Sequence, residues 1–549
     1  MHKPLLLLAG LLASTSAAAE ILISNVNGIQ VGPDGKLQHF GALLIDDNGR
    51  VESVIKMPTP RVKRYDRLID GQGKTLLPGL IDAHGHVLGL GFSALQLDLV
   101  GTSSLDDLKA RLKAYAAAHP EARWIQGRGW NQELWPDKSF PTAADLDSVV
   151  GDRPVVLERV DGHAIVVNSA AMKAAGVTAA TRSPPGGRIE NGLFVDNAIA
   201  LIGKAVPPAT PAENDQALAK AQDILLGYGV TGVGSMSTSL GDWQAMRRAG
   251  QAGRLNVRLM VYADELKLLG EVPRPTPWLY GDRLRMVGIK YYADGALGSR
   301  GAWLKQPYAD KPDSRGLQFH SDAELSDLHR RAAAAGFQIA THAIGDAANA
   351  QVIASYEQLS KQYGADRRWR IEHFQIADPA DIPRLAPAGI IASMQPTHQT
   401  SDRLMAEKRL GPTRLVGAYA WRTVLKSGAR LAFGTDFPVE SPDPFPGLAA
   451  AISRQDMAGQ PPGGWIPSER LNFEQALSAY TRGAAYAGFA EDRIGSLETG
   501  KWADFIIVDR DPTKVDAQTL GRTQVLETWV AGKKVWQRPA SASPTERGR

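Results

Sequence analysis

Cysteine is absent from the 549-residue sequence. Without thiols the protein forms no disulfide bond, and no cysteine is available to carry a lipid after signal-peptide cleavage. This absence suits an oxidising compartment, where unpaired thiols do not persist.

A strong excess of charge of one sign is also absent. The formal net charge is +4 and no dense Lys/Arg tract stands out, so neither nucleic acid nor an anionic membrane is indicated as a partner. Hydrophobic residues make up 44% and charged residues 22% of the chain, which is ordinary for a soluble globular protein. Beyond the N-terminus no apolar run approaches about 20 residues, so no further segment is expected to span a bilayer.

The first 19 residues have the three-part pattern of a secretory signal peptide. Met1-His2-Lys3 gives a positive start, residues 4–13 are rich in leucine and alanine, and a stretch of small residues ends at Ala17-Ala18-Ala19. We expect cleavage near Ala19-Glu20 and export to the periplasm or the medium. The alternative is a buried helix of the mature fold.

Both ends of the mature chain alternate in the manner of short strands separated by turns. Residues 20–75 and 490–538 share this pattern, so we predict one small β-sandwich domain built from both ends. The tail over residues 539–549 is polar, and we expect it to be disordered.

Helix-like and strand-like segments alternate through residues 76–489. Repeated βα units require a parallel sheet, and eight of them predict an α/β fold of the (β/α)8 TIM-like barrel type. Two separate doubly wound sheets are the competing topology, but no glycine fingerprint follows any strand. The candidate strands are 76–83, 230–235, 257–263, 286–293, 338–341, 369–372, 389–395 and 430–433.

The interval between the first two barrel strands, residues 94–225, is unusually long and contains strand-like segments of its own. An insertion in a βα loop emerges at the carboxyl ends of the strands, where barrel enzymes keep their active sites. We therefore predict a cap subdomain over the barrel mouth.

The first candidate barrel strand runs into two histidines, His84 and His86. Alternate side chains of a strand point the same way, so both imidazoles lie on one face at the carboxyl end of the strand. Neutral imidazole is a ligand for zinc or a similar divalent ion. Isolated His-x-His pairs usually bind nothing, so the weight of this motif depends on the residues that join it.

Later segments place further candidate ligands at or just after the ends of the fourth, fifth, sixth and eighth strands. Because barrel enzymes collect their chemistry at the carboxyl ends of the strands, these side chains are expected to meet His84 and His86 at one place. They are Lys290, His342, His373 and Asp436.

Around these residues the sequence resembles the amidohydrolase superfamily of metal-dependent hydrolases, in the YtcJ-like branch that includes N-substituted formamide deformylases. The resemblance extends over nearly all of the mature chain, with its motifs in the expected order. It is carried by residues 78–86, 289–300, 341–346, 371–375, 434–438 and 495–504.

The resemblance implies a centre of two divalent metal ions, with zinc as the default and manganese, cobalt or iron as alternatives. His84 and His86, together with Asp436, would hold one ion. His342 and His373 would hold the other, unless either contacts the substrate instead.

In the same resemblance Lys290 bridges the two ions as a carboxylated lysine. A carbamate formed with CO₂ offers two anionic oxygens, whereas a plain ammonium repels a cation. The alternative for Lys290 is a structural ion pair with a carboxylate such as Asp294.

From this centre we predict hydrolysis of a C–N bond, above all an amide, in a small-molecule substrate. A hydroxide that bridges two divalent ions is available near neutral pH and would attack the carbonyl carbon. Asp436 would accept the proton of the water and deliver it to the departing group, unless it serves as a ligand only.

Candidate substrate contacts are fewer and less specific. Trp130 and His163 lie in an aromatic and polar part of the insertion, where Trp124 and Trp135 are expected to be core residues instead. Downstream of the seventh strand, His398 would reach the substrate unless it is an exposed loop residue.

Arg300 has two interpretations. It would bind an acidic group of the substrate or brace Asp294, and we prefer the second.

Other functions stay open at this stage. Ester or lactone hydrolysis would use the same metals and the same attack. Deamination typically uses one metal and a Glu shortly after the fifth-strand histidine, whereas Ala343-Ile344-Gly345-Asp346 follows His342 here. A non-catalytic exported binding protein is disfavoured because no ligand position is empty. The substrate and the oligomeric state, including a homo-oligomer, are left open.

Overall fold

The computed structural model describes residues 20–56 and 65–539. The signal-peptide prediction for residues 1–19 therefore lies outside the described residues, as does nearly all of the predicted tail. Among the described helices, none is both long and apolar enough to cross a bilayer.

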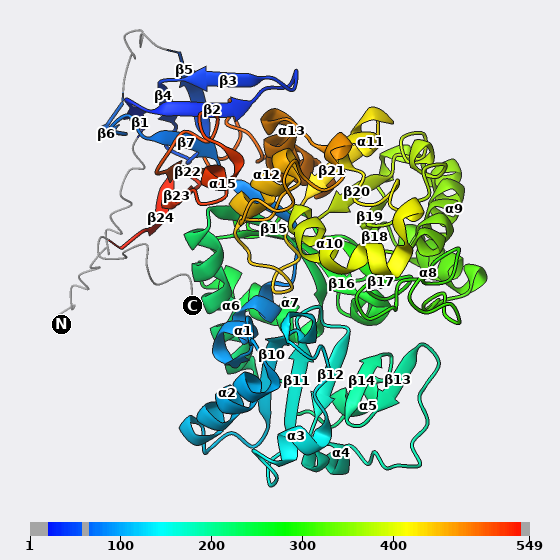
Figure 1. Ribbon diagram of the computed structural model, residues 1–549. Helices are drawn as coiled ribbons and strands as arrows, with labels where there is room; N and C mark the ends of the chain where they lie inside the picture. Colours follow the sequence, from blue (N-terminus) through cyan, green and yellow to red (C-terminus); the bar gives the residue numbers. More distant parts are fainter. Residues whose placement is uncertain (1–19, 57–64, 540–549) are drawn as a thin grey trace, which may run out of the picture.

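An eight-stranded parallel sheet, nearly closed as a barrel, forms the centre of the molecule (Figure 1). Each strand is almost wholly buried, as expected where helices cover one face of the sheet and side chains fill the other. The predicted (β/α)8 barrel is confirmed. Its strands are β8 (Leu80–Gly85), β15 (Val230–Thr238), β16 (Arg258–Asp264), β17 (Leu284–Tyr292), β18 (Gln338–Ala343), β19 (Arg370–His373), β20 (Ile391–Met394) and β21 (Arg430–Phe433).

The first predicted strand is divided in two. Residues 76–78 belong to β7 (Thr75–Pro78) of a different sheet, and the barrel strand β8 begins after Gly79. A Cβ at Gly79 would lie 2.2 Å from Oγ1 of Thr231, so only glycine allows the chain to pass there. The prediction of one strand over 76–83 was wrong because both halves are apolar and buried, and periodicity does not mark the break.

The Asp82 side chain closes the barrel between its first and last strands. Its carboxylate accepts hydrogen bonds from the backbone N–H and the hydroxyl of Thr435, at 3.0 and 2.7 Å. Burial raises the pKa of Asp82 to about 7, although these hydrogen bonds oppose the shift. Beyond it, the Asp436 N–H donates to the carbonyl of His84 at 2.8 Å, so the two strand ends that carry candidate ligands are held together.

Helices surround the barrel (Figure 1). Several begin at a Ser or Thr whose side chain pairs with an acidic residue three positions later, as at Thr210, Ser239 and Ser321. The helices of this layer are α1 (Val87–Leu95), α6 (Pro211–Gly227), α7 (Leu240–Gln251), α8 (Asp322–Ala334), α9 (Asp346–Tyr363), α10 (Pro396–Leu410), α11 (Trp421–Lys426), α12 (Pro444–Ser453), α13 (Phe473–Ser478) and α14 (Ala484–Ala487).

Both ends of the chain combine in a β-domain at one side of the barrel (Figure 1). One sheet has the order β5-β4-β1-β6 and the other the order β24-β23-β22-β7-β2-β3, and the two share one apolar core. The strands are β1 (Ile21–Ser24), β2 (Asn27–Val31), β3 (Leu37–Phe40), β4 (Ala42–Ile45), β5 (Val51–Ile55), β6 (Arg67–Asp70), β7, β22 (Phe505–Val508), β23 (Val525–Val530) and β24 (Lys533–Gln537); α15 (Ala517–Leu520) lies between β22 and β23.

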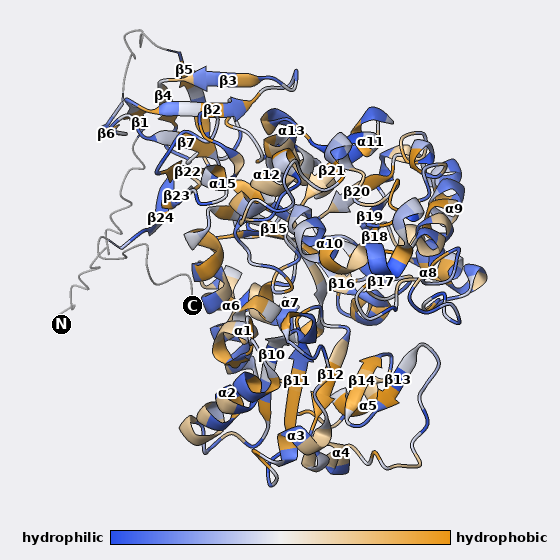
Figure 2. Ribbon diagram, in the orientation of Figure 1, coloured by the Kyte–Doolittle hydropathy of each residue, from blue (hydrophilic) through white to orange (hydrophobic). Residues whose placement is uncertain are grey.

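The long insertion forms a separate six-stranded sheet with its own hydrophobic core. Figure 2 shows its apolar strands β11, β12 and β14 on the side of the barrel away from the β-domain. The insertion ends before α6, which packs against α1 and α7 as part of the barrel layer. Its elements are β9 (Leu97–Asp98), α2 (Leu105–Ala118), β10 (Ile125–Trp130), α3 (Ala143–Asp147), β11 (Val155–Arg159), β12 (Ala164–Val167), α4 (Ser169–Ala174), β13 (Gly187–Glu190), β14 (Leu193–Asp196) and α5 (Ile199–Gly203).

Candidate active site

Asp436 is the meeting point of the candidate ligands. Its Oδ1 lies 3.2 Å from Nε2 of His84 and 3.1 Å from Nε2 of His86. Its Oδ2 lies 3.8 Å from Nε2 of His398 and 4.0 Å from Nδ1 of His373. Donor atoms from the first strand and from the sixth and seventh βα units therefore face one carboxylate.

Two residues of this cluster have left-handed backbone conformations. The φ angles are +76° at His373 and +61° at Asp436. Residues other than glycine rarely adopt such angles, and each costs of the order of 1–3 kcal/mol. The surrounding barrel holds both side chains in these conformations, which is typical of functional sites.

The Lys290 side chain enters the cluster from β17 and is buried. Its Nζ lies 3.3 Å from Nε2 of His84 and, among the described residues, forms no ion pair within 4.0 Å. Asp294 does not neutralise it, because that carboxylate accepts backbone N–H groups of Trp303, Ile344 and Gly345 at 2.8–2.9 Å. Burial lowers the pKa of Lys290 to about 8.

His342, on β18, has its ring centroid 4.6 Å from that of His373. Burial holds the pKa of both imidazoles well below the usual range, which keeps them neutral, as metal ligands must be. The Nε2 atom of His342 is buried without a hydrogen-bond partner among the described residues, and so is that of His398. Burial would raise the pKa of Asp436, but the neighbouring His84 and His86 hold it well below its usual range.

An outer layer of polar residues fixes the candidate ligands. Nδ1 of His84 lies 2.6 Å from Oε2 of Glu372, and Arg370 pairs with the same carboxylate. Nδ1 of His373 contacts Oε1 of Gln395 at 2.9 Å. Glu372 is not among the residues predicted from the sequence, although its place directly before His373 at the end of a barrel strand was a signal for it.

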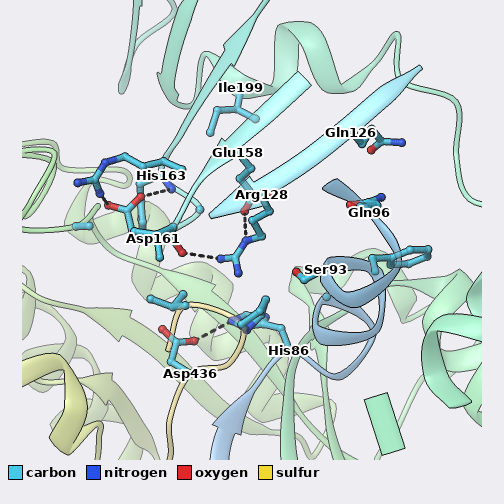
Figure 3. Close-up of a pocket in the computed structure, with 18 of the residues that line it drawn as sticks. His86, Ser93, Gln96, Gln126, Arg128, Glu158, Asp161, His163, Ile199 and Asp436 are labelled. Atoms are coloured by element: carbon cyan, nitrogen blue, oxygen red, sulfur yellow. Dashed lines mark hydrogen bonds and ion pairs between the residues drawn. The ribbon is translucent and has the colours of Figure 1, made fainter. Parts of the chain in front are cut away.

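The cluster lies at the inner end of a cavity of about 1940 Å³ that continues beneath the insertion. Figure 3 shows Arg128, Glu158, Asp161 and His163 of the insertion facing His86 and Asp436 across this space. Such a volume exceeds the roughly 300–1,000 Å³ of most ligand pockets.

His163 and His398 both line this cavity, but Trp130 does not. Trp130 is completely buried in the core of the insertion, and its Nε1 donates to the carbonyl of Leu157 at 2.8 Å. Regular strand alternation would place Trp130 on the same face as Trp124, which does line the cavity. Gly129, with φ of +110°, lies in a register shift that turns Trp130 to the opposite face.

Arg300 also lies away from the cavity. Its guanidinium donates to Asp310, at 2.9 Å to Oδ2 and 3.2 Å to Oδ1. Our preferred interpretation, that it braces Asp294, was wrong, because backbone N–H groups already satisfy that carboxylate.

The donor atoms fit divalent ions. Two groups have ligand atoms that all lie within 4.8 Å of one another: His84, His86 and Asp436, and His373, His398 and Asp436. The two groups share Asp436, so one carboxylate stands between two sets of imidazoles. His398 takes the place in the second group that we expected for His342, and its position after the seventh strand gave no metal-ligand signal.

Known proteins are similar to this chain in sequence and in fold. The protein named "Putative amidohydrolase YtcJ" of Bacillus subtilis (strain 168) is 35% identical over 85% of this chain and 90% of its own. N-substituted formamide deformylase of Arthrobacter pascens is 28% identical over 86% of this chain and 90% of its own. An uncharacterized metal-dependent hydrolase from Pyrococcus horikoshii OT3 superposes with a TM-score of 0.76 at 27% identity, covering 91% of this chain and 99% of that one.

The match to the amidohydrolase family as a whole extends over residues 67–536. It includes every barrel strand, the insertion and about half of the β-domain, whose strands β1 to β5 precede it. The chain belongs to the amidohydrolase family of metal-dependent hydrolases.

Proposed function

We propose that this hydrolase cleaves the C–N bond of a small amide with the help of two divalent metal ions. The observation that carries the proposal is the pair of ligand groups that share Asp436. A single structural site would need one closed set of ligands, whereas two adjoining groups open to a cavity provide for two ions and a substrate.

His84 and His86, with Asp436, would hold one ion, and zinc is the first expectation for such nitrogen-rich ligands. His373 would hold the second with His342 or His398, each of which has a buried Nε2 that makes no hydrogen bond to the described residues. Bound there, divalent ions activate water and polarise a carbonyl group.

Asp436 is the proposed proton carrier. Its carboxylate lines the cavity beside the other candidate ligands, so it is placed to accept a proton during attack on the carbonyl carbon. The same carboxyl group then donates that proton to the departing nitrogen. One residue can perform both tasks because accepting the proton gives the carboxylic acid that the second step needs, and donating it restores the carboxylate.

The proposed bond type is supported by the Arthrobacter pascens relative, whose name specifies an N-substituted formamide. A screen of zinc-loaded protein against N-substituted formamides, N-acyl amino acids, small peptides and lactones tests it. We expect turnover of at least one amide, loss of that turnover on chelation and recovery on adding zinc. Turnover of lactones alone would reassign the protein to ester chemistry, and metal-independent binding without turnover would make it a binding protein.

We also propose that Lys290 is carboxylated. A buried amine without a carboxylate partner is costly as a cation, and a carbamate between two divalent ions removes that cost. Incubation with ¹³C-bicarbonate and zinc should give a carbamate ¹³C signal in the wild type and none in Lys290→Gln. An identical spectrum for the two proteins would exclude the modification.

Export remains a proposal that rests on residues 1–19. Expression of the full chain in a Gram-negative host should place the protein in the periplasmic fraction with Glu20 as its first residue. Recovery from the cytoplasm with an intact N-terminus would contradict this.

A further inference from the structure

We propose that the insertion supplies a substrate-contacting residue, His163, and that Asp196 is the positioning residue that aims it into the cavity. This proposal rests on the proposed function, because the group that His163 would contact is the scissile amide. Nothing in the family match assigns a role to either residue.

His163 and Asp196 are joined twice. Nδ1 of His163 lies 2.7 Å from Oδ1 of Asp196, and the Asp196 N–H donates to the His163 carbonyl at 3.0 Å. The antiparallel pairing of β12 with β14 brings the two residues opposite each other. Their side chains are 17% and 1% exposed, so the imidazole reaches the cavity while the carboxylate is enclosed.

Two glycines of the barrel leave room for the carboxylate of Asp196. A Cβ at Gly295 would lie 3.2 Å from Oδ1 of Asp196, and a Cβ at Gly301 would lie 3.0 Å from Oδ2. Both glycines belong to the loop after β17, the strand that carries Lys290. The carboxylate of Asp196 is thus packed against the barrel loop that follows a candidate metal ligand.

The imidazole of His163 lies over the metal-ligand cluster. Its ring centroid is 5.5 Å from that of His342. The backbone N–H of His163 donates to Oδ1 of Asp161 at 3.2 Å, which fixes the chain at this residue. Because Asp196 occupies Nδ1, Nε2 is the ring atom left for a ligand, and it has no hydrogen-bond partner among the described residues. Figure 3 shows His163 and Asp161 on the opposite side of the cavity from Asp436.

A substrate held at the cluster would therefore be enclosed between Asp436 below and His163 above. A scissile amide offers a carbonyl oxygen and, when secondary, an N–H group, so Nε2 has a partner in either protonation state of the ring. A carboxylate that fixes the opposite nitrogen of an imidazole sets its orientation, which is the arrangement by which proteins aim a histidine.

The test compares His163→Phe, His163→Gln, Asp196→Asn and the double variant His163→Phe/Asp196→Asn, all loaded with zinc. For the amide that the wild type turns over, we expect kcat/KM to fall about 100-fold in His163→Phe. We expect a smaller loss in His163→Gln, which keeps a polar group, and about 10-fold in Asp196→Asn. The double variant should be no worse than His163→Phe, because Asp196 acts through His163.

A binding measurement separates this proposal from the proposed function. Acetohydroxamate, which presents an amide-like group, should bind the zinc-loaded wild type more tightly than His163→Phe by at least tenfold, as measured by calorimetry. Asp152→Asn, the same substitution at an exposed carboxylate of the insertion, is the matched control and should equal the wild type.

If the wild type hydrolyses no amide, the proposed function fails and the acetohydroxamate affinities still decide the role of His163. Equal turnover and equal affinity in His163→Phe and the wild type would overturn the inference while leaving the hydrolase in place. Additive losses in the double variant would show that Asp196 does not act through His163.

Discussion

Glu372 and His84 form a completely buried pair, with 2.6 Å between Oε2 and Nδ1. Burial would raise the pKa of Glu372, but Arg370 and His84 hold it well below its usual range, so the carboxylate stays charged. It accepts the Nδ1 proton of His84 and leaves Nε2 to face Asp436. The orientation of a candidate ligand thus depends on a residue that does not touch the cavity.

Replacing Glu372 by Gln should weaken metal binding. An amide orients His84 less strongly and lowers the basicity of the ring, and loss of such a partner typically costs about 10–100-fold in metal affinity. Competition titration with a chromophoric chelator measures the change. Glu52→Gln, at an exposed position of β5, should bind zinc as the wild type does. Equal affinities for all three proteins would show that Glu372 has only a structural role.

Asp436→Asn should lose turnover more than it loses metal. An amide can still ligate an ion through oxygen but cannot carry a proton, and such proton transfer contributes typically 10²–10⁴-fold to rate. Metal content by elemental assay and kcat on the identified amide are to be measured on the same sample. Full turnover at full metal occupancy would refute the proton-carrier role.

The placement of the candidate ligands was predictable because it follows from topology. Once the chain alternates strands and helices, the carboxyl ends of parallel strands meet, and His84, Lys290 and His342 are brought to one mouth. Predicting this placement required no knowledge of side-chain packing. Their roles as metal ligands stay predictions until a metal is measured.

The substrate contacts were less predictable because they depend on local backbone geometry. One extra residue near Gly129 turns Trp130 away from the cavity face, and the sequence pattern does not reveal such a register shift. Arg300 pairs with Asp310, ten residues away, because the nearer Asp294 is already saturated by backbone N–H groups. Which backbone N–H groups donate to Asp294 depends on the folded conformation of the loop, so the sequence pattern does not reveal it.

Arg258 and Asp504 join the barrel to the β-domain. The guanidinium on β16 donates to the carboxylate before β22 at 2.6 and 2.9 Å, and both side chains are buried. Arg258→Met leaves Asp504 charged and without its partner, so the free energy of unfolding should fall by about 3–5 kcal/mol. Chemical denaturation measures it. As the control, Arg330→Met removes an exposed ion pair and should lower the free energy of unfolding by about 0–1 kcal/mol. Equal losses in the two variants would show that the buried pair contributes no more to stability than an exposed one.

His329 makes the stability of the barrel depend on pH. Its ring is buried, with Nδ1 2.9 Å from the Ser355 hydroxyl and Nε2 2.9 Å from that of Thr341, and burial lowers its pKa from 6.5 to about 3. Below pH 6.5 the unfolded chain therefore binds a proton that the folded chain does not. The contribution of this residue to stability is full above pH 6.5 and is lost as the pH falls toward 3.

The substitution His329→Gln should remove this loss of stability at low pH. At pH 8 the variant is expected to be less stable than the wild type by about 1–3 kcal/mol, because buried hydrogen bonds are disturbed. As the pH falls below 6.5 the gap should narrow by up to about 1.4 kcal/mol per pH unit, since one fewer group gains a proton on unfolding. Thermal unfolding at pH 8, 6.5 and 5 measures the gap, and His39→Gln, at an exposed position, is the control. A gap that stays constant from pH 8 to 5 would mean that His329 takes up its proton over the same pH range in the folded and the unfolded protein, contrary to its burial between two hydroxyl groups and two tyrosine rings.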